Sequence, residues 1–231
     1  MVHASTFWRP QLAKTGSDPW RLVLTVVLGV AMLVFWDSAV FWPVKIVVVF
    51  FHELSHAIAA WITGGEVVSI GLGMDQSGVT QTIGGWTFLI LNAGYVGSLL
   101  WGVGLLAASR RGSWARPMLG LLAGLVAIVA LAFVRPLISF GFLFALLVAG
   151  ALGLGARRMS DATASTVLQA LGTFSVLYAL LDVRDDVLSS SGASVSDATM
   201  LAAATGVPAV VWGVGWMVAG VGTLWVCRRW L

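Results

Sequence analysis

Three residues inside one apolar run have the types and spacing of a metal-dependent hydrolytic site: His52, Glu53 and His56. Residues four apart on a helix share a face, so both imidazole rings can point at one Zn²⁺. Glu53 can then take a proton from a zinc-bound water as a general base. Ionisable residues within a membrane segment are expensive and usually functional. We therefore expect a zinc site with His52 and His56 as ligands and Glu53 as the catalytic base.

A catalytic zinc site usually has three protein ligands, so a third must come from elsewhere in the chain. Asp182 stands out because it ends an apolar run, at a helix end where a lone carboxylate needs a compensating cation. Several other side chains have suitable donor atoms. These rivals are Asp185, Asp186, Glu66, His3 and Cys227.

The composition indicates that lipid is part of the solvent. Hydrophobic residues make up 59% of the 231 residues, and charged residues only 10%, against about 25% in an ordinary soluble domain. A soluble fold of this size has too little interior to hide so much apolar surface. Basic residues form short clusters at the ends of apolar runs, and no basic stripe with interleaved aromatics exists, which excludes nucleic acid as a partner.

Seven apolar segments are long enough, or nearly so, to span a bilayer, with the first and second divided only by a break near Pro43. They are 21–42, 43–63, 86–108, 114–134, 136–155, 163–182 and 207–227. The sequence thus predicts an all-α polytopic membrane protein with six to seven transmembrane helices. Residues 1–20 form a polar N-terminal segment and residues 21–231 a single integral membrane domain. We expect a multi-pass protein of the cell membrane.

Residues 64–85 differ in kind from the apolar runs. Two short segments rich in β-branched residues, 66–72 and 79–82, flank a turn-like stretch and are bounded by glycine pairs. This pattern predicts a small β-hairpin after the second helix. Because open sheet edges are unstable in lipid, we expect it at the interface or in a protein-lined cavity near the active site.

The basic residues give conflicting indications of orientation. Arg9, Lys14 and Arg21 favour a cytoplasmic N-terminus. If all seven segments span, the remaining clusters fall on the opposite side of the membrane. These are Arg110, Arg111, Arg116, Arg157, Arg158, Arg228 and Arg229. The sequence alone does not decide between a non-spanning segment and an external N-terminus.

The membrane-embedded His52–His56 motif, the hairpin after it and the later pair Leu181-Asp182 resemble the site-2 protease family of intramembrane zinc metalloproteases. In that family an Asp in a Leu-Asp-Gly motif completes the zinc site, although Val183 stands here in place of the Gly. The resemblance implies Asp182 as the third zinc ligand. The family's Ala-Gly-Pro-x-x-Asn segment corresponds to residues 93–98, with Tyr95 for Pro and Ser98 for Asn.

These features favour an intramembrane zinc metalloprotease acting on membrane-bound protein substrates. A substrate strand added to the hairpin edge would expose its peptide bonds, and Asn92 is a candidate for holding a substrate carbonyl. The alternative is a non-proteolytic membrane protein with a structural or regulatory zinc. The general base Glu53 favours the first reading, because a structural site does not need one. A transporter is disfavoured by the scarcity of charge within the membrane outside the motif.

Overall fold

The computed structural model of the chain describes residues 19–36, 38–188 and 196–228, with the side chains of residues 185–188 left out. Its elements follow in chain order. They are α1 (Pro19–Val34), α2 (Trp42–Ile62), β1 (Glu66–Leu72), β2 (Gly78–Ile83), α3 (Thr87–Ser109), α4 (Gly112–Phe133), α5 (Phe140–Arg158), α6 (Asp161–Leu188), α7 (Asp197–Thr205) and α8 (Ala209–Cys227). Among these described residues, six helices are long and apolar enough to cross a membrane. The predicted fold class is confirmed.

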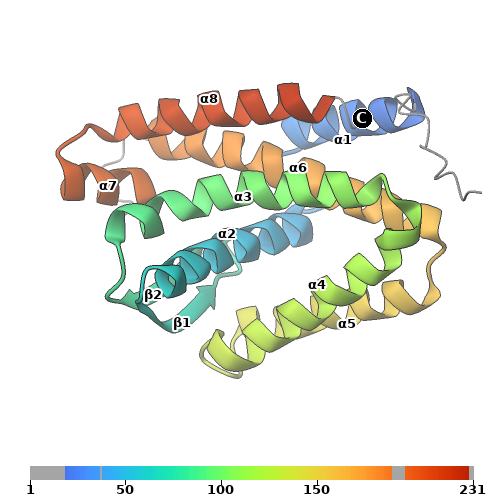
Figure 1. The fold of residues 1–231 in the computed structure, drawn as a ribbon, viewed down its shortest axis with the longest axis horizontal. Coiled ribbons are helices and arrows are strands. Elements are labelled where there is room, and N and C mark those ends of the chain that lie inside the picture. Colours follow the sequence, from blue (N-terminus) through green and yellow to red (C-terminus); the bar gives the residue numbers. More distant parts are fainter. Residues whose placement is uncertain (1–18, 37, 189–195, 229–231) are drawn as a thin grey trace, which may run out of the picture.

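Helix α2 occupies the centre of the bundle and is buried along most of its length. It packs against α3, α6 and both strands, while α4 and α5 form a pair to one side (Figure 1). Helices α6 and α8 also pack against one another and against α3. A helix that is apolar on all sides is stable only in such surroundings. The predicted zinc motif therefore lies in the most enclosed element of the molecule.

Two helix ends and one additional helix differ from the predictions. Helix α1 ends at Val34 and is shorter than a bilayer-spanning helix, because the chain turns before Trp42 instead of continuing. Helix α6 runs on to Leu188, so Asp182 lies within a helix and not at its end. The polar stretch between the last two predicted spans, residues 183–206, contains an unpredicted short helix, α7. Ser196 and Thr199 cap its first turn reciprocally, which satisfies backbone groups that a helix start leaves unpaired.

The predicted hairpin is present as two antiparallel strands, with Ile70 paired to Thr80. It does not project away from the bundle. The indole nitrogen of Trp42, at the start of α2, donates a hydrogen bond to the carbonyl oxygen of Met74 at the hairpin tip, at 2.7 Å. On the outer side of β1, the amide of Arg135 donates to the carbonyl oxygen of Ile70 at 3.1 Å. The hairpin thus lies along α2, and β2 has the freer outer edge.

Candidate metal centre

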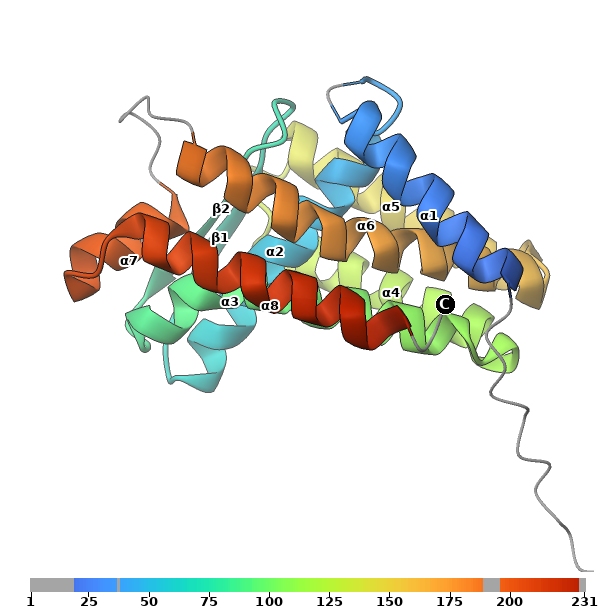
Figure 2. The same cartoon turned by 90° about the horizontal axis from the view of Figure 1, so that it is seen from above.

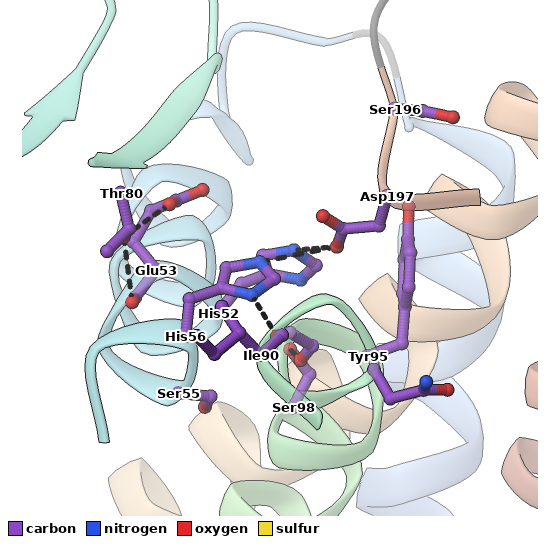
Figure 3. A network of polar contacts seen from close by, with 12 residues as sticks. His52, Glu53, Ser55, His56, Thr80, Ile90, Tyr95, Ser98, Ser196 and Asp197 are labelled. Carbon is purple, nitrogen blue, oxygen red and sulfur yellow. Dashed lines mark hydrogen bonds and ion pairs between the residues drawn. The ribbon is translucent and has the colours of Figure 1, made fainter. Parts of the chain in front are cut away.

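Helix α2 brings His52, Glu53 and His56 together as their spacing predicts. Each is less than a tenth exposed, and one ligand atom from each lies within 4.8 Å of the others. The two imidazole rings are 4.8 Å apart between centroids and meet edge to face. Figure 3 shows them pointing from α2 toward α7, with Glu53 turned toward the hairpin. Buried polar groups of this kind need specific partners.

The carboxylate beside the His pair belongs to Asp197, the first residue of α7. Its Oδ2 lies 3.1 Å from His52 Nε2 and 3.2 Å from His56 Nε2. The predicted ligand Asp182 instead accepts a hydrogen bond from the hydroxyl of Tyr95 at 3.0 Å. Burial favours protonation of Asp197, yet the adjacent His56 and His52 hold the pKa of Asp197 well below its usual range. Two imidazoles and an ionised carboxylate therefore converge on one point.

The hydrogen bonds of His56 test whether a cation fits this point. Its Nδ1 lies 2.7 Å from the carbonyl oxygen of Ile90, which can only accept, so the hydrogen of a neutral ring is on Nδ1. In that neutral state the lone pair of His56 Nε2 would face the carboxylate oxygen of Asp197, so the contact requires a cation between the two atoms, either a second proton on the ring or a metal ion. Imidazole nitrogen and carboxylate oxygen are common zinc ligands, so the donor set fits Zn²⁺.

The ring of His52 is held mainly by aromatic side chains. Tyr95 and Tyr178 meet it edge to face, at centroid distances of 4.9 and 6.4 Å. Its Nδ1 is buried and has no hydrogen-bond partner among the described residues. Tyr95, in turn, is fixed by Asp182 and by packing on Trp216, at 4.5 Å between centroids. Asp182 thus acts on the site through Tyr95 in this structure.

A glycine on α3 leaves room for the two rings. A Cβ built on Gly94 would collide with Nε2 of His52 and lie 2.6 Å from Nε2 of His56. These are the two nitrogens that face Asp197. A side chain at position 94 would therefore occupy the place where the ligand atoms converge.

Substituting Gly94 with Ala should lower zinc affinity by roughly tenfold to a hundredfold, since overpacking a filled site costs about 1–3 kcal/mol. Gly104→Ala on the same helix is the matched control, because a Cβ there meets nothing within 4 Å. Zinc affinity can be measured by competition with a chromophoric chelator in detergent. Equal affinities of the two variants would contradict this account of Gly94.

Glu53 is positioned by the hairpin. The hydroxyl of Thr80 on β2 donates to Oε2 of Glu53 at 2.7 Å and contacts its backbone carbonyl oxygen at 2.9 Å. A Cβ on Gly78 would collide with the other carboxylate oxygen, Oε1. Among the described residues Thr80 donates to Oε2 and not to Oε1, so Oε1 is the oxygen available to a reacting group. Thr80 and Gly78 were not predicted as site residues, although both belong to the predicted hairpin.

The other side chains predicted as ligands or substrate contacts lie apart from the His pair or outside the described residues. Asn92 donates to the Phe88 carbonyl oxygen and accepts from the indole of Trp216, so a role in substrate binding stays a prediction. Glu66 is exposed on β1, and Cys227 packs against Leu106. His3 and the side chains of Asp185 and Asp186 lie outside the described residues.

Comparison with protein families agrees with the geometry. A family model described as Peptidase M50B-like matches residues 25–227. The chain belongs to the Peptidase M50B-like family. No curated protein and no solved structure matches it. The M50B-like family is the site-2 protease family, so the resemblance seen in the sequence is confirmed. Together with six apolar helices, it identifies an integral, multi-pass membrane protein.

Proposed function

We propose that the chain is an intramembrane zinc metallopeptidase that hydrolyses peptide bonds of membrane-bound proteins. The observation that carries the proposal is the convergence of His52 Nε2, His56 Nε2 and Asp197 Oδ2, a donor set typical of zinc, beside the buried Glu53. Asp197 is proposed as the third ligand in place of Asp182. The buried carboxylate of Glu53 beside this point favours a catalytic zinc site over a structural one, because a structural site needs no base.

Zinc, when bound, supplies Lewis acidity and makes water a stronger acid near neutral pH. The residues of the chain supply the rest. Glu53 receives the proton of the attacking water and can return it to the leaving amine nitrogen. Thr80 holds one oxygen of this carboxylate, so that the other can face the reacting atoms. Helices α2, α3 and α6 pack together at the centre, where His52, Glu53 and His56 are buried.

Strand β2 is suited to presenting a substrate. A peptide in a helix keeps its carbonyls hydrogen-bonded, whereas a strand added to a sheet edge exposes them alternately. The outer edge of β1 is already contacted by Val134 and Arg135, which leaves β2 as the freer edge. Thr80 and Gly78, both on β2, are the hairpin residues that approach Glu53. A peptide paired with β2 would therefore lie close to the base.

The decisive experiment combines metal analysis with cleavage of a single-span membrane reporter by purified protein. We expect one zinc per chain, cleavage that stops on chelation and returns with zinc, and loss of both zinc and cleavage in His52→Ala and His56→Ala. Stoichiometric zinc in both His variants would contradict the site. Zinc bound by the two His residues without cleavage of any membrane reporter would favour the non-proteolytic alternative.

A further inference from the structure

A cleft separate from the metal centre opens where three membrane helices end. Its walls come from the start of α4, the end of α5 and the start of α6, and its volume is about 530 Å³. The lining residues are Ser113, Arg116, Pro117, Gly120, Ala156 and Asp161. Figure 2 shows these helix ends together at one end of the bundle, near the start of α1. None of the metal-centre residues lines this cleft, so the proposed hydrolytic function does not account for it.

The cleft is polar at one end and apolar at the other. Ser113 and Arg116 lie in the first turns of α4, whereas Gly120 and Ala156 form an apolar wall. Gly120 lies roughly 10 Å further along the helix axis than Ser113. The exposed indole of Trp114, next to Ser113, marks the headgroup level of the bilayer. The cleft therefore runs from the headgroup level toward the hydrocarbon core.

The guanidinium of Arg116 is held in place by the end of α5. Its Nε donates to the carbonyl oxygen of Ala156 at 3.0 Å, and its Nη2 donates to that of Arg157 at 3.2 Å. These are carbonyls of the last helical turn, which a helix leaves without internal partners. A guanidinium has five N–H donors in a fixed geometry. Within the described part of the chain Nη1 makes no hydrogen bond, so it is available to a ligand in the cleft.

The helix ends around the cleft have an excess of positive charge. Arg110 and Arg111 form the turn that leads into α4. Arg157 and Arg158 end α5 and are exposed. Among the residues that the structure describes, none of these arginines forms an ion pair, and neither does Asp161. Nη1 of Arg110 is buried without a hydrogen-bond partner there. With Arg116, five arginines stand against one carboxylate, which favours an anionic ligand.

We propose that the cleft binds an anionic phospholipid. The phosphodiester accepts a hydrogen bond from Nη1 of Arg116, and an acyl chain follows the apolar wall past Gly120. Guanidinium groups suit phosphate oxygens, and basic pockets between membrane helices bind such headgroups. Asp161, at the polar end, can accept from a headgroup hydroxyl, so phosphatidylglycerol fits the cleft. A free phosphate would use only the polar end.

Binding of phosphatidylglycerol to the purified protein in detergent tests the proposal without zinc or turnover. Arg116→Gln removes the charge in the cleft. Arg135→Gln is the matched control, because Arg135 also donates to carbonyl oxygens at a helix end but lies outside the cleft. Native mass spectrometry gives the affinity for the first bound lipid. It should fall at least about fivefold in Arg116→Gln, the effect of one basic residue near an anionic surface, and stay unchanged in Arg135→Gln.

A second pair of variants tests the apolar wall while all arginines remain. Gly120→Leu fills the cleft beside Ala156, which a Cβ at position 120 would meet at 3.7 Å. Gly124→Leu is its control, because Gly124 is on the same helix outside the cleft and a Cβ there meets nothing within 4 Å. We expect weaker phosphatidylglycerol binding only in Gly120→Leu. Unfolding midpoints of the lipid-free variants separate lost binding from lost folding.

Equal affinities of Arg116→Gln and Arg135→Gln would overturn the proposal, as would unmodified protein that binds phosphatidylcholine as tightly as phosphatidylglycerol. Inorganic phosphate that binds as tightly as phosphatidylglycerol, and is lost in Arg116→Gln, would show an anion site and refute the lipid. Tighter binding of phosphatidylethanolamine, abolished in Asp161→Asn, would replace the anionic headgroup with an amine. Unchanged lipid binding in Gly120→Leu would refute the path of the acyl chain.

Discussion

Asp197→Asn is expected to weaken zinc binding by at least about a hundredfold. Asp182→Asn should weaken it far less, because the amide oxygen of Asn can still accept from the Tyr95 hydroxyl. Loss of an outer-shell partner of a metal ligand already weakens binding by about 10–100-fold, and loss of a ligand should do more. Asn keeps the size of Asp at the start of α7 but removes the charge that faces His52 and His56. The measurement is zinc affinity of the purified variants by competition with a chelator.

Asp182→Asn is the matched control, because it makes the same chemical change in a neighbouring carboxylate that contacts Tyr95. His52→Ala serves as the positive control for zinc loss. Unfolding midpoints of the zinc-free proteins separate lost ligation from lost folding. Weak binding in Asp182→Asn together with normal binding in Asp197→Asn would restore Asp182 as the ligand and refute Asp197.

Glu53→Gln is expected to abolish turnover while zinc remains bound. A positioned general base contributes about 10²–10⁴-fold to rate, and Gln cannot accept the proton. The amide oxygen of Gln can still accept from Thr80, so the side chain should keep its position. The measurement is cleavage of the membrane reporter alongside zinc content, both on the same purified sample.

Glu66→Gln controls for the loss of one negative charge, since Glu66 is exposed on β1. It should cleave the reporter at the unmodified rate. Turnover by Glu53→Gln within a few-fold of the unmodified protein would reject Glu53 as the base. Loss of zinc in the same variant would instead indicate that Glu53 is a ligand.

The parts of the protein governed by local pattern could be predicted from the sequence. Helical periodicity placed His52 and His56 on one face of α2, and the buried α2 keeps both at the site. Glycine pairs and β-branched segments predicted the hairpin at residues 64–85, as observed. Hydropathy predicted the spans, except that it extended the first one beyond Val34.

The third carboxylate depended on tertiary structure. Asp182 was favoured because it adjoins an apolar run and resembles the Leu-Asp motif of the family, while Asp197 lies in a polar insertion. Only the fold of that insertion against α3 brings Asp197 to the His pair. A local signal existed in Ser196 and Thr199, whose spacing is typical of a helix start and would place Asp197 in a first turn. Nothing local indicates that this turn meets α2.

The anchoring of the hairpin affects the entropy of substrate binding. Its base is fixed by the bond from the Trp86 amide to Thr63, its centre by Thr80 on Glu53, and its tip by Trp42 on Met74. A free hairpin of two strands is only marginally ordered in water. Here the backbone of β2 is ordered before any peptide arrives, so only the peptide loses conformational freedom on pairing. Because β2 is already ordered, pairing with β2 costs less entropy. A substrate peptide can therefore leave its helical state for the strand more easily.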